Sequence, residues 1–218
     1  MRLVMPRLYV ILDAEALVEP VQETARKLGD AGVRMLQYRN KQGSARELLL
    51  DASKLAEIAR ETQMGFVVND RADVAHLAGA DGVHVGQDDL SVEQARSLVG
   101  RERWVGISTH NQVQFEAAMK TSADYIAIGP IFATASKRNP DPVVGTKLIR
   151  RLRPLTGKPI VAIGGITLQR ASEVIQAGAN SVAVISDILR APDPVQRVQQ
   201  YLQILECSGQ SSDQPPGH

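Results

Sequence analysis

The chain has 218 residues, of which 44% are hydrophobic, so it is long enough for one domain with a sizeable core and too short for two large domains. Its 25 Lys and Arg residues nearly balance 24 Asp and Glu residues, and this small net charge of +1 disfavours a nucleic-acid coat or a polybasic membrane anchor. Its one cysteine, Cys207, excludes an internal disulfide and a cysteine-built metal site, which fits a reducing compartment.

Eight short runs rich in β-branched residues alternate with longer amphipathic stretches. The runs are 8–12, 33–39, 65–69, 82–85, 104–108, 125–129, 159–164 and 181–186. The first is too short for a signal peptide or a membrane span, so we expect a cytoplasmic protein. The runs begin about 25 residues apart, which is the length of one β-α unit. Eight such units predict an α/β protein, a (β/α)₈ barrel forming a single domain over residues 1–206.

The main alternative is a doubly wound sheet, which normally has a glycine-rich turn after its first strand. Here Asp13, Ala14 and Glu15 follow that strand, so no such turn is present. Two capping boxes, 44–47 and 91–94, predict helix starts and leave 37–43 and 86–90 as loops. A longer loop, 130–144, contains three prolines, and residues 207–218 have the composition of a disordered tail.

Polar residues follow the second and third runs, where a barrel builds its active site. The two-residue period of a strand directs Gln37 and Arg39 inward, with Lys41 in the loop beyond them. Solvated surface positions for Arg39 and Lys41 remain an alternative. Asn69 and Asp70 end the third run, and Asp70 could instead cap the following helix.

The fourth run supplies a second carboxylate at the same end of the barrel. Ser91 already serves as a helix cap, which leaves Asp89 free. Asp70 and Asp89 are oxygen ligands of the kind that Mg²⁺ uses when it also binds substrate phosphate. His84 alternates with apolar Val83 and Val85, which favours a buried core histidine over a ligand.

The remaining strand ends offer hydroxyls, a lysine and paired glycines. Ser108 and His110 have no acidic partner in their own segment, so they do not indicate a hydrolytic triad. The loop after the sixth run carries Thr134, Ser136 and Lys137, and that lysine could close over an anion or be an ordinary exposed charge. The paired glycines 164–165 and Ser186 follow the last two strands, where such barrels commonly bind phosphate, although a tight turn would also explain the glycines.

Taken together, these segments resemble the thiamine phosphate synthase family from about residue 8 to residue 189. The segments that carry the resemblance are QYRNK, VNDRADVAHLAGADGVHVGQDDL, GISTHN, YIAIGPIFATASKRNPDPVVG, AIGGIT and VISDIL. The resemblance implies a TIM barrel that joins hydroxymethylpyrimidine diphosphate to hydroxyethylthiazole phosphate, or its carboxylated form. The products would be thiamine monophosphate and pyrophosphate, with Mg²⁺ as cofactor.

The resemblance also implies a role for each matching residue. It makes Asp70 and Asp89 the Mg²⁺ ligands, and it places Gln37 and Ser108 at the pyrimidine and its leaving group. The implied contacts of the diphosphate are Arg39, Lys41, Asn69 and Lys137. The implied contacts of the thiazole phosphate are Thr134, Ser136, Gly165, Ile185 and Ser186. Ser136 stands where the family more often has threonine, and it keeps the hydroxyl.

The implied mechanism is dissociative: the bond to pyrophosphate breaks first, and the thiazole nitrogen captures the pyrimidine cation. Three cations, Arg39, Lys41 and Lys137, against Asp70 and Asp89 leave a small positive excess, to which Mg²⁺ adds. Rival hypotheses are a thiazole tautomerase relative, a sugar-phosphate isomerase or epimerase, and a non-catalytic regulator that binds thiamine phosphates. Small-molecule substrates are the expected partners, without nucleic acid or membrane, and a homo-oligomer is left open.

Overall fold

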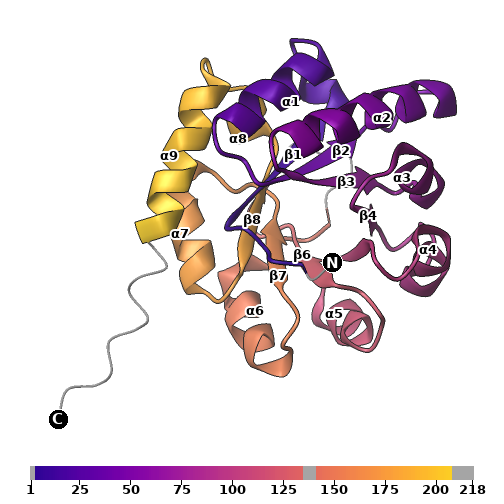
Figure 1. The fold of residues 1–218 in the computed structure, drawn as a ribbon. Coiled ribbons are helices and arrows are strands. Elements are labelled where there is room, and N and C mark those ends of the chain that lie inside the picture. Colours follow the sequence, from indigo (N-terminus) through magenta and orange to yellow (C-terminus); the bar gives the residue numbers. More distant parts are fainter. Residues whose placement is uncertain (1–2, 135–140, 208–218) are drawn as a thin grey trace.

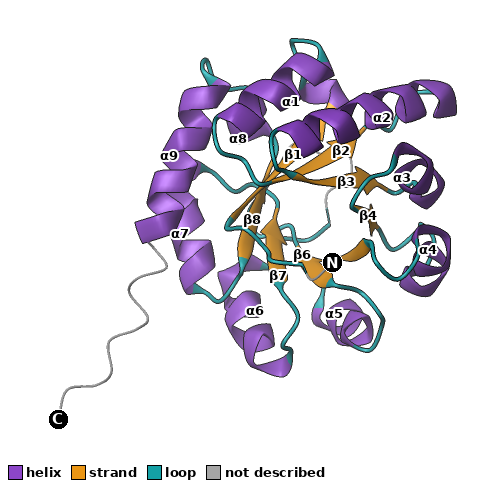
Figure 2. Ribbon diagram, in the orientation of Figure 1, coloured by secondary structure: helices purple, strands orange, loops and turns teal. Residues whose placement is uncertain are grey.

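The computed structural model describes residues 3–134 and 141–207. Eight parallel strands pair in chain order and close into a barrel, with β1 beside both β2 and β8 (Figures 1 and 2). The strands are β1 (Leu8–Asp13), β2 (Met35–Arg39), β3 (Gly65–Asn69), β4 (Gly82–Val85), β5 (Trp104–Thr109), β6 (Tyr125–Ile128), β7 (Ile160–Ile163) and β8 (Ser181–Val184). The predicted (β/α)₈ barrel is therefore confirmed.

Helices surround the barrel on its outside, as Figure 1 shows. They are α1 (Val21–Asp30), α2 (Ala45–Glu61), α3 (Ala72–Ala78), α4 (Val92–Val99), α5 (Gln112–Met119), α6 (Gly145–Leu152), α7 (Leu168–Gln176), α8 (Ser186–Leu189) and α9 (Pro194–Cys207), with 3₁₀ turns η1 (Ala14–Ala16) and η2 (Arg153–Leu155). Both predicted capping boxes form, with Ser44 starting α2 and Ser91 starting α4.

The ends of some predicted elements differ from the structure. The run 33–39 yields a strand only from Met35, because Val33 belongs to the turn that leaves α1. The run 181–186 stops at Val184, since Ser186 already begins α8. Cys207 ends α9, while the rest of the predicted tail, 208–218, lies outside the described residues.

The buried core has two layers, because successive side chains of a strand point to opposite faces. Along β1, Leu8, Val10 and Leu12 face the helices, whereas Tyr9 and Ile11 belong to the cluster inside the barrel. The inner cluster comprises Tyr9, Ile11, Met35, Val67, Trp104, Tyr125, Ala127, Val161 and Ala183. These side chains fill the inside of the barrel below the carboxyl ends of the strands.

Candidate active site

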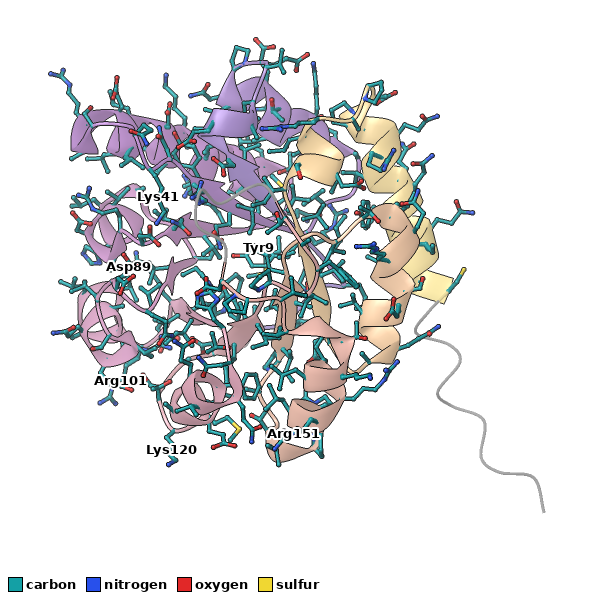
Figure 3. All side chains as sticks on the ribbon, turned by 180° about the vertical axis from the view of Figure 1, so that it is seen from behind. Tyr9, Lys41, Asp89, Arg101, Lys120 and Arg151 are labelled. Carbon is teal, nitrogen blue, oxygen red and sulfur yellow. The ribbon has the colours of Figure 1, made fainter. Side chains whose placement is uncertain are left out.

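A cavity of about 1150 Å³ opens at the carboxyl ends of the strands. Every predicted site residue that the structure describes lines it, namely Gln37, Arg39, Lys41, Asn69, Asp70, Asp89, Ser108, Thr134, Gly165, Ile185 and Ser186. Figure 3 views this end of the barrel, with Tyr9 near its middle and Lys41 and Asp89 on one side. Ser136 and Lys137 lie outside the described residues. Segments spread from β2 to β8 thus contribute to one cavity.

Two carboxyl groups meet at the ends of β3 and β4. Asp70 has a φ of 63°, a left-handed conformation that Asp tolerates better than most residues, and its N–H donates to the His84 carbonyl oxygen at 2.7 Å. The predicted alternative for Asp70 is wrong, because Arg71 occupies the N-cap of α3 and no side chain caps that helix. Lys41 Nζ lies 2.8 Å from Asp70 Oδ2, so this lysine is paired although its side chain is 48% exposed.

Asp89 is held by the Gly86 N–H, which donates to its Oδ2 at 2.7 Å. Burial raises the pKa of the Asp89 carboxyl, and the hydrogen bond with Asp70 and the charge of that residue raise it further, against the opposing effects of Gly86 and Lys41. Two neighbouring carboxyl groups can share a proton in this way, and a cation bound between them would take the place of that proton. No group of three acidic, His or Cys side chains in the described residues could hold a metal, so the remaining ligands would be substrate or water oxygens, as Mg²⁺ commonly uses.

Arg39 is paired with a residue that the sequence reasoning missed. Its guanidinium lies 2.6 Å from Asp13 Oδ2, and the two side chains are only 18% and 7% exposed. The strand register explains the pair, because Asp13 of β1 stands directly beside Arg39 of β2. Arg39 is therefore a largely buried, paired cation and not the solvated surface charge of the alternative prediction. The alternation of inward residues along β1 could have indicated Asp13.

A chain of polar side chains forms the floor of the cavity. Gln37 Nε2 donates to the Tyr9 hydroxyl at 2.8 Å, and the Tyr9 and Tyr125 hydroxyls lie 3.1 Å apart. His84 Nδ1 lies 3.0 Å from the Tyr125 hydroxyl, and its Nε2 lies 2.9 Å from Ser108 Oγ. Burial lowers the pKa of His84 to about 4, so the ring is neutral at pH 7. His84 is the buried, hydrogen-bonded histidine that its pattern predicted, and it also lines the cavity.

The structure assembles no hydrolytic triad from Ser108 and His110. His110 Nδ1 lies 2.7 Å from the Gly129 carbonyl oxygen and 3.4 Å from Asp141 Oδ2. His110 therefore has an acidic neighbour from a distant segment. Ser108, however, is hydrogen-bonded to His84, whose other ring nitrogen is hydrogen-bonded to Tyr125. Nucleophilic catalysis by Ser108 lacks the orienting carboxylate that such chemistry uses.

Backbone geometry explains the paired glycines on the opposite side of the cavity. Gly164 and Gly165 have φ angles of 95° and 64°, and a Cβ on Gly165 would lie 2.3 Å from the Ala133 carbonyl oxygen. The tight turn predicted as the alternative is thus real, and the same glycines also line the cavity beside Ser186. Arg170 is a further cavity residue without a sequence prediction, with its guanidinium 4.5 Å from the centre of the Phe132 ring.

Comparison with known proteins supplies the family. The model of the family described as thiamine monophosphate synthase matches residues 8–188. The chain belongs to this family. A thiamine-phosphate synthase from Koribacter versatilis is 56% identical over 206 residues, covering 92% of this chain and 96% of that protein. A thiamine-phosphate synthase from Lawsonia intracellularis is 40% identical, covering 91% and 92% of the two chains.

A solved structure supports the same family. Thiamine phosphate pyrophosphorylase from Pyrococcus furiosus superposes with a TM-score of 0.85 at 32% identity, covering 93% of this chain and 96% of that one. The predictions of the thiamine phosphate synthase family and of its transferase activity are thereby confirmed. Across residues 3–134 and 141–207, no helix has both the length and the apolar character needed to cross a membrane.

Proposed function

We propose that the cavity couples hydroxymethylpyrimidine diphosphate to hydroxyethylthiazole phosphate, or to its carboxylated form, and releases pyrophosphate. The family supports the reaction, and the position of the predicted residues around one cavity supports their roles. Gln37 and Ser108 hold the pyrimidine end and its leaving group. Thr134, Gly165, Ile185 and Ser186 bind the thiazole phosphate, together with Ser136 beyond the described residues.

The charge of the diphosphate end carries the proposal of a metal cofactor. Arg39 and Lys41 are the described cations there, but Asp13 and Asp70 already pair with them, and Asp89 adds a third carboxylate. The small positive excess expected from the sequence counted Lys137, which lies outside the described residues, and it omitted Asp13. Lys137 would bring this end only to neutrality, which is too little for a diphosphate carrying about three negative charges.

We therefore infer that Asp70 and Asp89 bind Mg²⁺. When bound, this ion supplies positive charge to the departing pyrophosphate. Arg39, Lys41 and Asn69, with Lys137, hold the diphosphate oxygens so that charge can develop on them as the C–O bond lengthens. The cavity floor excludes water and orients the pyrimidine, and the reaction is dissociative, with no protein nucleophile. Positioning two substrates in one cavity supplies much of the remaining acceleration.

The test is a coupled synthesis with purified protein. Thiamine monophosphate should form only when both substrates and Mg²⁺ are present, and omission of either substrate or addition of EDTA should abolish it. Asp89→Asn should lower the rate about 100-fold or more while keeping the cooperative thermal transition, because Asn retains the oxygen that accepts from Gly86 but loses the charge. Arg101→Gln is the matched control, since Arg101 lies at the outside of the molecule (Figure 3).

Two outcomes would contradict the proposal. Conversion of the thiazole tautomer without any coupled product would favour the tautomerase relative. Binding of thiamine phosphates without turnover would favour the regulator. A role as sugar-phosphate isomerase or epimerase has only the barrel fold in its support.

We also propose that the protein acts in the cytoplasm on small-molecule substrates. Light scattering can measure whether it forms a homo-oligomer.

A further inference from the structure

The hydrogen-bond chain across the barrel joins two residues that the proposed function places at the same substrate. Gln37 stands at one end, on β2, and Ser108 stands at the other, on β5. Between them lie Tyr9, Tyr125 and His84, which are at most 7% exposed. The three inner residues carry neither a metal nor a phosphate role in the proposed function. Their hydrogen bonds nevertheless determine whether Gln37 and Ser108 donate or accept toward a ligand in the cavity.

Counting donors and acceptors gives the chain a direction. Gln37 Nε2 can only donate, so the Tyr9 oxygen accepts this hydrogen bond. The Tyr9 hydroxyl then donates its own proton to the Tyr125 oxygen, which is its acceptor among the described residues. The Tyr125 proton then goes to His84 Nδ1. A neutral imidazole that accepts at Nδ1 must donate at Nε2, so His84 donates to Ser108 Oγ. The hydroxyl proton of Ser108 is left free to face the cavity.

The opposite direction costs more free energy. If Ser108 donated to His84, the unused proton would be that of Tyr9, whose side chain is 1% exposed. A buried donor without an acceptor loses its hydrogen bond to water and gains none in the protein. Ser108 is only partly buried and lines the cavity, so its free proton can reach a ligand. The contacts of His84 support this direction, because its ring is buried and its two nitrogens meet the hydroxyls of Tyr125 and Ser108.

The fold makes room for this chain at one position. Gly106 of β5 pairs with His84 of β4 on one side and with Tyr125 of β6 on the other. A Cβ on Gly106 would lie 2.1 Å from Tyr125 Cζ and 2.5 Å from His84 Nδ1. The two rings therefore meet across a glycine, stacked with their centroids 5.5 Å apart. Any larger residue at 106 would separate them.

We propose that Tyr9, Tyr125 and His84 are positioning residues that hold a one-way hydrogen-bond chain, with a carbonyl acceptor at Gln37 and a hydroxyl donor at Ser108. Gln37 then accepts from an amino group of the pyrimidine, and Ser108 donates to the oxygen of the leaving group. The inference rests on the proposed function for the identity of the ligand, but the direction of the chain is a property of the protein alone. Reversing the chain would remove the Ser108 donor.

The direct test is the tautomer of His84 in the ligand-free protein. Nitrogen-15 correlation spectra of histidine-labelled protein at pH 7 distinguish the two neutral tautomers from the charged ring. The protein has only four histidines, so His84→Gln identifies the His84 signal by its loss. We expect hydrogen on Nε2 and none on Nδ1. Hydrogen on Nδ1, or on both nitrogens, would overturn the inference.

The functional consequence is tested with Tyr125→Phe, which removes one oxygen and keeps the ring. His84 should then take up a population with hydrogen on Nδ1, and kcat should fall about 10- to 100-fold, the effect of losing one hydrogen bond to a developing charge. KM for the pyrimidine diphosphate should change less than kcat. Tyr201→Phe is the matched control, because it removes a buried hydroxyl that donates to Asp187 at 2.8 Å, and it should leave the His84 tautomer unchanged.

The outcomes separate this inference from the proposed function. An unchanged tautomer and kcat in Tyr125→Phe would refute the chain even if the coupled synthesis proceeds. The expected tautomer in a protein that makes no thiamine monophosphate would refute the proposed function and leave the chain's direction standing. The spectrum of the parent protein decides the direction even if the variant does not fold.

Discussion

Asp13 shows how one unpredicted residue changes the charge of the cavity. It pairs with Arg39 while both side chains are mostly buried, at 7% and 18% exposure. Removing one partner of a buried ion pair leaves the other charge without compensation. Asp13→Asn should therefore destabilise the fold by about 3 kcal/mol. Urea unfolding measures this change in free energy.

The matched control for that pair is Glu19→Gln at the exposed ion pair of Glu19 with Lys27, where both side chains are about half exposed. Exposed pairs contribute about 0–1 kcal/mol, so this variant should unfold almost as the parent does. Equal destabilisation by the two substitutions would show that burial does not govern the Asp13 pair.

Burial of neutral His84 should make the free energy of unfolding depend on pH in the acidic range. Its pKa is near 4 in the folded protein, against about 6.5 for a free imidazole in the unfolded chain. Because the folded pKa is lowered, the unfolded state binds the proton first, and stability falls as the pH drops from about 6.5 towards 4. His84→Gln should flatten this part of the profile of unfolding free energy against pH. An identical slope in parent and variant would show that His84 is not buried in its neutral form.

At the scale of elements, β4, β5 and β6 depend on the small size of Gly106. Gly106→Ala should destabilise the protein by about 1–3 kcal/mol or more, since its Cβ would overlap the Tyr125 and His84 rings. Gly157→Ala is the control, because a Cβ there meets no atom within 4 Å. Differential scanning calorimetry should show a lower Tm for the first variant alone. A Tm loss of the same size in both would remove the steric explanation.

Local sequence signals predict the elements, but they do not predict the contacts between elements. The β-branched runs predicted all eight strands, and the capping boxes at Ser44 and Ser91 located two helix starts, because these signals are local. The inward direction of Gln37 followed from the period of two. The pairing of Asp13 with Arg39 and of His84 with Tyr125 depends on the register between strands, which no single segment specifies.

At the scale of the whole molecule, the net charge of +1 conceals an uneven distribution. The barrel brings Asp70 and Asp89 to one end of the cavity and places Asp13 behind Arg39 at that end, where the described cations do not outnumber these carboxylates. Strand ends that are far apart in the sequence meet there because eight parallel strands share one rim. Strand ends could be predicted as site residues from the fold class, whereas the sign of their summed charge required the structure.

Pyrophosphate binding shows whether this cavity is a diphosphate site completed by a divalent cation. Isothermal titration calorimetry should show pyrophosphate binding in the presence of Mg²⁺, and at least about 10-fold weaker binding without it, because each factor of ten needs only about 1.4 kcal/mol of added attraction. Asp89→Asn should lose most of the Mg²⁺ effect. Equal pyrophosphate affinity with and without Mg²⁺ in the parent protein would show that no divalent cation completes the site.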